Sequence, residues 1–173
     1  MNTVLFNKNK IAIIGISASG KTMVAELIAK KTGLPLFHID QLMYTGNWNL
    51  CPEEEYNLLH KKLLASHSRW IIEGYVYEKM LNRLEEADLI IYLDYSGMRN
   101  VWQYIKRYIT HRKKNRTELP DAKEVFYWRI FKRLFDKGKE WRVIEDVLRK
   151  VGDKEKVLRI SSPRELCAYL KYC

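Results

Sequence analysis

The chain has 173 residues, of which 47% are hydrophobic and 30% are charged. This composition is typical of one ordered globular domain and argues against a disordered chain. No apolar run approaches the roughly 20 residues that span a bilayer, and the polar N-terminal residues do not resemble a signal peptide. We therefore expect a cytoplasmic protein without a membrane partner, folded as a single domain over residues 1–173. The three scattered cysteines predict free thiols rather than disulfides or a zinc site.

The formal net charge of +10 is unevenly distributed along the chain. From Arg99 to Lys150 there are 16 Lys and Arg residues but only 7 Asp and Glu residues, a net of +9. A basic region of this kind attracts anionic ligands. Charge alone does not distinguish a nucleotide from a nucleic acid, so both partners stay open at this point.

Strand and helix patterns alternate along the chain. Short apolar runs predict strands at 10–14, 36–39, 70–72, 89–93 and 157–160. Helices are predicted at 21–31, at 52–68 with Tyr56, Leu59, Leu63 and Leu64 on one face, and at 78–87. A long basic helical region follows the fourth strand with a break near 115–120, and Ser162-Pro163 begins a last helix. This alternation predicts an α/β fold, a parallel sheet covered by helices on both faces.

A phosphate-binding motif lies between the first strand and the first helix. Gly15-Ile16-Ser17-Ala18-Ser19-Gly20-Lys21-Thr22 matches G-x-x-x-x-G-K-[ST] at every fixed position. The glycines let backbone N–H groups turn toward phosphate oxygens, and the helix N-terminus adds its dipole. In such a loop the lysine contacts the β- and γ-phosphates and the threonine hydroxyl ligates Mg²⁺. We therefore expect Gly15, Ser17, Ala18, Ser19, Gly20, Lys21 and Thr22 to bind ATP, with Thr22 also a metal ligand.

Three carboxylates, Asp40, Glu73 and Asp94, come just after predicted strands. Ligands gather at the carboxyl ends of strands in an open parallel sheet. Phosphoryl transfer needs acidic groups to hold Mg²⁺ and to orient or deprotonate the acceptor hydroxyl. Asp40 is the candidate for the acceptor side, because an aromatic-rich loop with Trp48 follows it. Either Glu73 or Asp94 is the metal-side carboxylate, with a helix cap as the alternative role of Asp94.

The basic region contains three arginines, Arg107, Arg112 and Arg116, spaced five and four residues apart. Arginines that close over a transferring phosphoryl group stabilise its charge, and a lid that carries them excludes water. The alternative is an ordinary solvated basic face. His38 is interpreted as a structural residue that packs or forms a hydrogen bond.

Over nearly its full length the chain resembles the small P-loop nucleoside and nucleotide kinases of the adenylate kinase-like group. Within that group it is most similar to the bacterial "DNA topology modulation" (FlaR-like) proteins. The segments that carry the resemblance are Gly15 to Thr22, His38-Ile39-Asp40 with Trp48, Trp70 to Tyr75, Arg83-Leu84 with Ala87-Asp88, Trp102, Lys106-Arg107, Arg112 and Arg116.

The resemblance implies a three-layer α/β/α P-loop NTPase fold with five parallel strands in the order 2-3-1-4-5. It implies an acceptor-binding region at about 40–75, a lid-like basic segment at about 107–120, and an adenine base beside Ser161 and Arg164. The residues that it implies for acceptor binding are Asp40, Trp48, Gly74 and Arg83.

The sequence departs from the family pattern at three places. Glu73 stands where related kinases usually carry an Asp that holds magnesium through water. Tyr95-Ser96-Gly97 replaces a Pro-Arg pair, and Gln103 stands where a basic residue is common. A lid with fewer arginines indicates a different acceptor or weaker catalysis.

Together these features predict an ATP- and Mg²⁺-dependent kinase that acts on a small acceptor, a nucleoside or nucleotide. The catalytic residues expected are Lys21, Asp40, Arg107, Arg112 and Arg116, with Thr22 and Glu73 on the metal side. Two alternatives stay open, a nucleotide-binding regulator that contacts DNA through the basic segment and a plain NTPase. The acceptor, the preferred donor base and the oligomeric state do not follow from the sequence.

Overall fold

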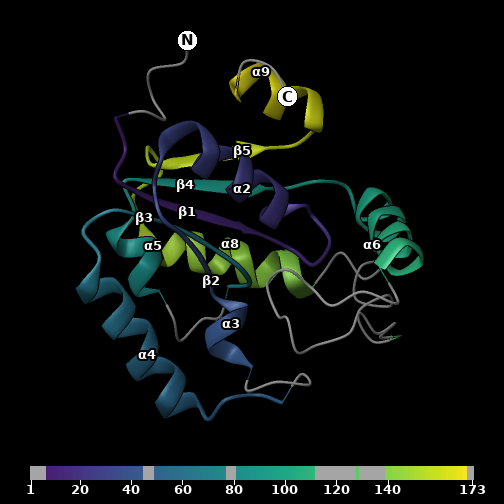
Figure 1. Cartoon of the computed structure of the whole chain (residues 1–173). Helices are drawn as coiled ribbons and strands as arrows, with labels where there is room; N and C mark the ends of the chain where they lie inside the picture. Colours follow the sequence, from purple (N-terminus) through teal and green to yellow (C-terminus); the bar gives the residue numbers. More distant parts are fainter. Residues whose placement is uncertain (1–6, 45–48, 77–80, 112–127, 129–138, 171–173) are drawn as a thin grey trace.

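The computed structural model describes residues 7–44, 49–76, 81–111, 128 and 139–170. Its strands form one parallel sheet in the order β2-β3-β1-β4-β5 (Figure 1). This order confirms the predicted fold class. The strands are β1 (Lys10–Gly15), β2 (Leu36–His38), β3 (Trp70–Glu73), β4 (Leu89–Leu93) and β5 (Val157–Ile160).

Most helices in the described residues agree with the sequence pattern to within a few residues, but the short helix at Asp40–Met43 was not predicted, since a loop was expected after Asp40. The predicted break near 115–120 lies outside the described residues. The helices are α2 (Lys21–Thr32), α3 (Asp40–Met43), α4 (Glu53–Ser66), α5 (Asn82–Glu86), α6 (Gly97–His111), α8 (Lys139–Val151) and α9 (Pro163–Leu170).

Side chains of each strand alternate between the two faces of the sheet, and each face has its own apolar core. Ile11 and Ile13 of β1 pack on the face that α2 and α9 cover. Ala12 and Ile14 pack on the opposite face, where α4, α5, α6 and α8 contribute buried residues. Figure 1 shows α2 and α9 on one side of the sheet and α5 and α8 on the other. The central strands β1, β3 and β4 are buried on both faces, as is usual in a parallel sheet, and the edge strands β2 and β5 are only partly buried.

Helix ends follow the signals in the sequence. Gly33 ends α2 in a left-handed conformation with φ +69°, and its N–H donates to the Ala29 carbonyl. Ser162 caps α9, because its Oγ accepts a hydrogen bond of 3.2 Å from the Glu165 N–H. These ends set where the loops that flank the sheet begin.

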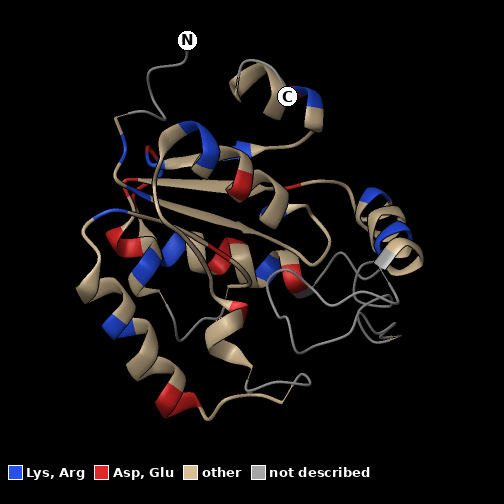
Figure 2. Cartoon of the chain, in the orientation of Figure 1, with Lys and Arg blue, Asp and Glu red and all other residues tan. Residues whose placement is uncertain are grey.

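The basic region is described only in part. Helix α6 carries Arg99, Lys106 and Arg107 and no acidic residue, which Figure 2 shows as blue segments without red. Arg112, Arg116 and most of the expected lid lie outside the described residues. Within the described part of the chain, every helix is too short or too polar to cross a membrane.

Candidate active site

The phosphate loop joins β1 to α2 in a conformation that few residues adopt. Gly15 has φ +156°, and a Cβ there would lie 2.9 Å from the carbonyl oxygen of Leu93. Ala18 also has a positive φ of 60°, which is rare for a residue with a side chain. Such backbone strain concentrates at functional sites, where it positions groups for a ligand.

The loop leaves backbone donors at the start of α2 without side-chain caps. The N-cap residue is Gly20, which has no side chain that could cap the helix. Within the loop, the Ser19 N–H donates a hydrogen bond of 3.3 Å to the Ile16 carbonyl. The first N–H groups of a helix have no partner inside the helix, so they are available to a phosphate. The loop therefore has the geometry of an anion-binding site.

Lys21 folds back over the same loop. Its Nζ donates to the Ile16 carbonyl at 2.9 Å. Burial lowers the pKa of Lys21, and the charges of Glu73 and Asp40 oppose this, while the Arg107 charge adds to it. Asp40, Glu73 and Arg107 therefore each lie within electrostatic range of Lys21, although they come from separate parts of the chain.

Thr22, Glu73 and His38 meet at the ends of β2 and β3. The Thr22 Oγ1 donates to Glu73 Oε1 at 3.2 Å, and His38 Nδ1 lies 2.7 Å from the same oxygen. Because a carboxylate oxygen only accepts, Nδ1 is the donor. Sequence reasoning predicted a structural role for His38 but did not identify Glu73 as its partner. Strand register held the signal, because His38 and Glu73 are paired neighbours in β2 and β3.

These side chains suit magnesium in their chemistry. Mg²⁺ prefers oxygen ligands, and it is commonly held by one or two protein groups together with substrate phosphates. Thr22 and Glu73 supply a hydroxyl and a carboxylate at the loop. No group of three His, Cys, Asp or Glu side chains within the described residues is arranged to hold a metal ion alone. The donor set therefore fits a magnesium ion that arrives with a nucleotide.

Asp40 begins α3 directly after β2. The preceding residue, Ile39, donates its N–H to the Glu73 carbonyl at 2.9 Å, which ties the Asp40 backbone to the end of β3. Gly74 makes this approach possible, because a Cβ on Gly74 would lie 2.0 Å from Ile39 Cγ2. Asp40 thus lies on the β2–β3 side of the phosphate loop. Trp48, the other expected acceptor residue of this loop, is outside the described residues.

Arg83 lies in α5, next to the chain that follows β3. It is completely buried, and its Nη2 donates to the Tyr75 carbonyl at 2.5 Å. Tyr75 follows Glu73 and Gly74, so Arg83 supports the backbone just beyond the metal-side carboxylate.

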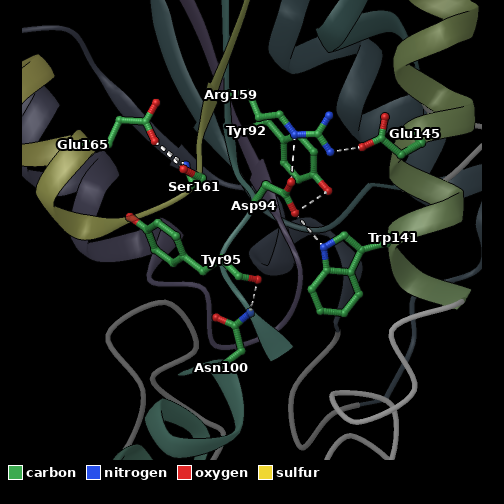
Figure 3. A network of polar contacts seen from close by, with 9 residues as sticks. All are labelled: Tyr92, Asp94, Tyr95, Asn100, Trp141, Glu145, Arg159, Ser161 and Glu165. Atoms are coloured by element: carbon green, nitrogen blue, oxygen red, sulfur yellow. Dashed lines mark hydrogen bonds and ion pairs between the residues drawn. The ribbon is translucent and has the colours of Figure 1, made fainter. Parts of the chain in front are cut away.

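Asp94 has a different environment from Glu73. Its carboxylate accepts hydrogen bonds from Trp141 Nε1 at 2.7 Å and from Arg159 Nε at 2.8 Å (Figure 3). Arg159 in turn pairs with Glu145 on α8. The predicted helix-cap role is not seen, because α6 begins only at Gly97 and Asp94 instead joins β4, β5 and α8. This network favours Glu73 over Asp94 as the metal-side carboxylate.

A cavity of about 510 Å³ opens beside this network, within the size range of ligand pockets. Ser161 is one of its walls, and its N–H and Oγ both donate to Glu165 Oε2 at 2.7 Å. Arg164 is exposed in the first turn of α9 and does not line the described part of the cavity. The lining residues are Asp94, Tyr95, Ser96, Trp141 and Ser161.

Comparison with known proteins shows the fold and no closer relationship. No protein-family model and no curated protein matches the chain. Among solved structures, the chain is similar to shikimate kinase from Acinetobacter baumannii in complex with shikimate, with a TM-score of 0.59 and 12% sequence identity. The similarity covers 99% of this chain and 94% of that one. The chain therefore has the fold of a P-loop kinase, and the roles of its residues rest on its own geometry.

Proposed function

We propose that the protein is an ATP-dependent phosphotransferase that acts on a small hydroxyl-bearing acceptor. One observation carries the proposal. The phosphate loop lies between two different sites, the cavity at the ends of β4 and β5 and the group of Asp40, Glu73 and His38 at the ends of β2 and β3. A kinase needs a donor side and an acceptor side that meet at one phosphate.

On the donor side, the amides of the phosphate loop and Lys21 hold the phosphates of ATP. The cavity that Tyr95, Trp141 and Ser161 line receives the nucleobase, since these side chains offer aromatic surface and a hydroxyl. Arg164 is a weaker candidate for this role because it points to solvent.

On the acceptor side, Asp40 orients the acceptor hydroxyl and takes its proton as the oxygen attacks the γ-phosphorus. A new P–O bond forms, the bond to the β–γ bridging oxygen breaks, and ADP leaves. Thr22 and Glu73 would hold Mg²⁺, which would supply positive charge to offset that of the phosphates. Arg107 neutralises charge that develops in transfer, and Arg112 and Arg116 are proposed to join it.

The acceptor that we propose is a nucleoside or nucleotide, as in the adenylate kinase-like group that the sequence resembles. Membership of the FlaR-like subgroup stays a prediction. The wider proposal of phosphoryl transfer does not depend on that choice, because it rests on the side chains around Lys21.

An acceptor screen tests the proposal. ADP release from Mg·ATP is measured with nucleosides, nucleotides, small sugars and hydroxy acids, in the wild type and in Lys21→Ala. We expect at least one acceptor to raise ADP release in the wild type and none in the variant, in which loss of the cation lowers the rate by about 100-fold or more. Lys30→Ala, an exposed lysine of the same helix, is the matched control and should behave as wild type. A screen in which no acceptor exceeds the Lys21→Ala background would refute the kinase.

A DNA-binding regulator is the second candidate, favoured by the acid-free basic helix α6. Its affinity for duplex DNA should fall steeply with salt, because phosphate contacts release counterions. A gel-shift assay at about 50 mM and 200 mM salt distinguishes the two: a kinase without a DNA role shows no specific shift at either concentration. The plain NTPase predicts ADP release that no acceptor increases.

A further inference from the structure

Helix α6 presents a line of apolar side chains to solvent. Met98 is 81% exposed, Trp102 is 67% exposed and Ile109 is 65% exposed. Together with the half-buried Ile105 they occupy positions i, i+4, i+7 and i+11, so they follow one another along one face of the helix. We call these four residues the α6 stripe. Single exposed apolar residues are common on proteins, but a continuous row of them marks an interaction surface.

A different face of α6 attaches the helix to the rest of the protein. Val101 and Tyr104 are buried in the apolar core on that side of the sheet. The buried Asn100 donates from Nδ2 to the Tyr95 carbonyl at 3.2 Å, which fixes the first turn of the helix. Figure 1 shows α6 at the edge of the molecule. The helix therefore already has its packing face, and the α6 stripe is a second apolar face.

The charges around the α6 stripe are all positive. Every charged residue of α6 is a cation, as the blue segments of Figure 2 show. Lys106 is exposed and lies four residues after Trp102, next to the stripe. Arg99 lies over the Tyr95 ring at 4.7 Å. A second copy that paired its own α6 with this one across a two-fold axis would bring these cations together. The surface is therefore complementary to an anionic partner.

The chemistry of the stripe fits the surface of a lipid bilayer. Helices that lie in the membrane interface combine Lys and Arg on one side with Trp and aliphatic residues on the other. Trp favours the level of the lipid headgroups, and cations beside it attract anionic lipids. The phosphates of a nucleic acid would match the cations but leave Met98 and Ile109 in water. An anionic bilayer accounts for both the charge and the apolar stripe.

We propose that the α6 stripe and Lys106 form a docking surface for an anionic lipid bilayer. The helix lies in the interface and does not cross it, in agreement with its length and polarity. The expectation of no membrane partner rested on the lack of a spanning segment, which an interfacial helix does not need. Arg107, whose charge reaches Lys21, lies over the Tyr104 ring and outside the stripe. The docking surface is thus separate from the phosphate loop.

Vesicle flotation tests the proposal on the full chain. We expect binding to vesicles of phosphatidylcholine mixed equally with phosphatidylglycerol, weaker binding at higher salt, and little binding to phosphatidylcholine alone. Trp102→Ser should weaken binding about tenfold or more, because a large apolar side chain is lost from the interface. Lys106→Gln should weaken it roughly fivefold. The matched controls Leu58→Ser and Lys61→Gln, exposed residues of α4, should bind as the wild type does.

Insertion of the stripe is measured separately from attraction to charge. Lipids brominated on their acyl chains quench the fluorescence of a tryptophan that reaches the acyl region. We expect these lipids to quench the wild type in mixed vesicles and to quench Trp102→Phe much less, at lipid concentrations that bind both proteins fully. Trp102 is exposed, so both substitutions should leave the melting temperature without lipid unchanged. Equal quenching in the two proteins would mean that the stripe does not enter the bilayer, and would overturn the proposal.

Three further results would overturn the proposal. The first is wild-type protein that does not float with the mixed vesicles, or Trp102→Ser and Lys106→Gln that float as the wild type does. The second is a dimer that forms without lipid and that Trp102→Ser dissociates in sedimentation experiments, since a second copy would then cover the stripe. The third is DNA binding lost in Trp102→Ser together with no binding to vesicles. None of these readouts uses turnover, so they are independent of the proposed kinase activity.

Discussion

A single oxygen of Glu73, Oε1, contacts both His38 Nδ1 at 2.7 Å and Thr22 Oγ1 at 3.2 Å. The two contacts connect the ends of β2 and β3 to the first turn of α2. Glu has one more methylene group than Asp, and hence one more rotatable bond to order when it holds a metal. We infer that His38 restricts this extra freedom and presents the carboxylate in one orientation. Partners that orient a metal ligand commonly matter nearly as much as the ligand itself.

Magnesium dependence checks this arrangement. Glu73→Gln keeps the size of the side chain but removes its charge, so the Mg²⁺ concentration for half-maximal ADP release should rise about tenfold or more. His38→Ala should raise it several-fold, because the carboxylate is intact but less well oriented. Glu26→Gln, an exposed residue of α2, is the control.

Binding of a fluorescent ATP analogue, titrated with Mg²⁺, gives the same comparison without turnover. Equal magnesium requirements in the wild type and Glu73→Gln would mean that another carboxylate, such as Asp94, faces the metal.

The Asp94 network should contribute to stability rather than to metal binding. Asp94→Ala removes the carboxylate that accepts hydrogen bonds from Trp141 and Arg159, and both donors lose this partner. The free energy of unfolding should therefore fall by about 1.5–3 kcal/mol. Asp146→Ala is the control, because Asp146 forms an exposed pair with Arg149 that should be worth less than about 1 kcal/mol. Urea denaturation measures both. Similar losses in the two variants would show that the network of Figure 3 adds nothing beyond a surface ion pair.

Gly74 should be required for both the fold and the acceptor side. In Gly74→Ala the new methyl group would overlap Ile39, 2.0 Å from its Cγ2, in addition to strain at φ +146°. We expect a loss of about 3–5 kcal/mol in the free energy of unfolding, together with reduced activity because Ile39 precedes Asp40. Gly33→Ala has strain at φ +69° but no neighbour within 4 Å, so it should lose only about 1–2 kcal/mol and keep its activity. A Gly74→Ala protein as stable as Gly33→Ala would contradict the contact.

We expect the free energy of unfolding to decrease in mild acid because of His60. Burial first, and then the Arg83 charge, lowers the pKa of His60 from 6.5 to about 4 in the folded state, and Glu86 opposes this. The unfolded chain therefore binds a proton between pH 6.5 and pH 4 that the folded chain does not. Stability falls as the pH decreases through this window, by roughly 2–3 kcal/mol from this group.

His60→Gln isolates that contribution, because glutamine does not titrate. Unfolding free energies measured from pH 7 to pH 4 should decline less steeply in His60→Gln than in the wild type. Parallel curves for the wild type and His60→Gln would show that His60 is not held neutral by burial.

The predicted apolar face of α4 illustrates where local patterns fail. Apolar spacing placed Tyr56, Leu59, Leu63 and Leu64 on one face of α4. Tyr56 and Leu64 are buried, but Leu59 is 36% exposed, and the polar His60 is buried in its place. Which residues of a helix face the core depends on the rotation of the helix against its neighbours. Here His60 is buried near the buried Arg83 of α5, although the apolar spacing of α4 alone would place His60 in solvent.

Local chemistry was enough to predict the strands, most of the helices and the position of the phosphate loop, although it missed the short helix α3. Buried strands appear in the sequence as short apolar runs. The conformation of Gly15 to Thr22 depends mainly on residues within the segment itself, because it is set by glycine torsions and by the start of the next helix. The parallel sheet followed from the alternation of strands and helices. Its order came from the resemblance to P-loop kinases, and the structure confirms it.

Only packing between distant segments decided which of the three carboxylates lies at the phosphate loop and which joins another hydrogen-bond network. Asp40, Glu73 and Asp94 look alike in the sequence, since each follows a strand. Strand order brings His38 beside Glu73 and brings Arg159 and Trp141 to Asp94, so one carboxylate faces the loop and the other joins a network. The environment of a charged side chain depends on which strands are neighbours, and hydrogen bonds between residues 35 to 65 positions apart form only when the chain has folded.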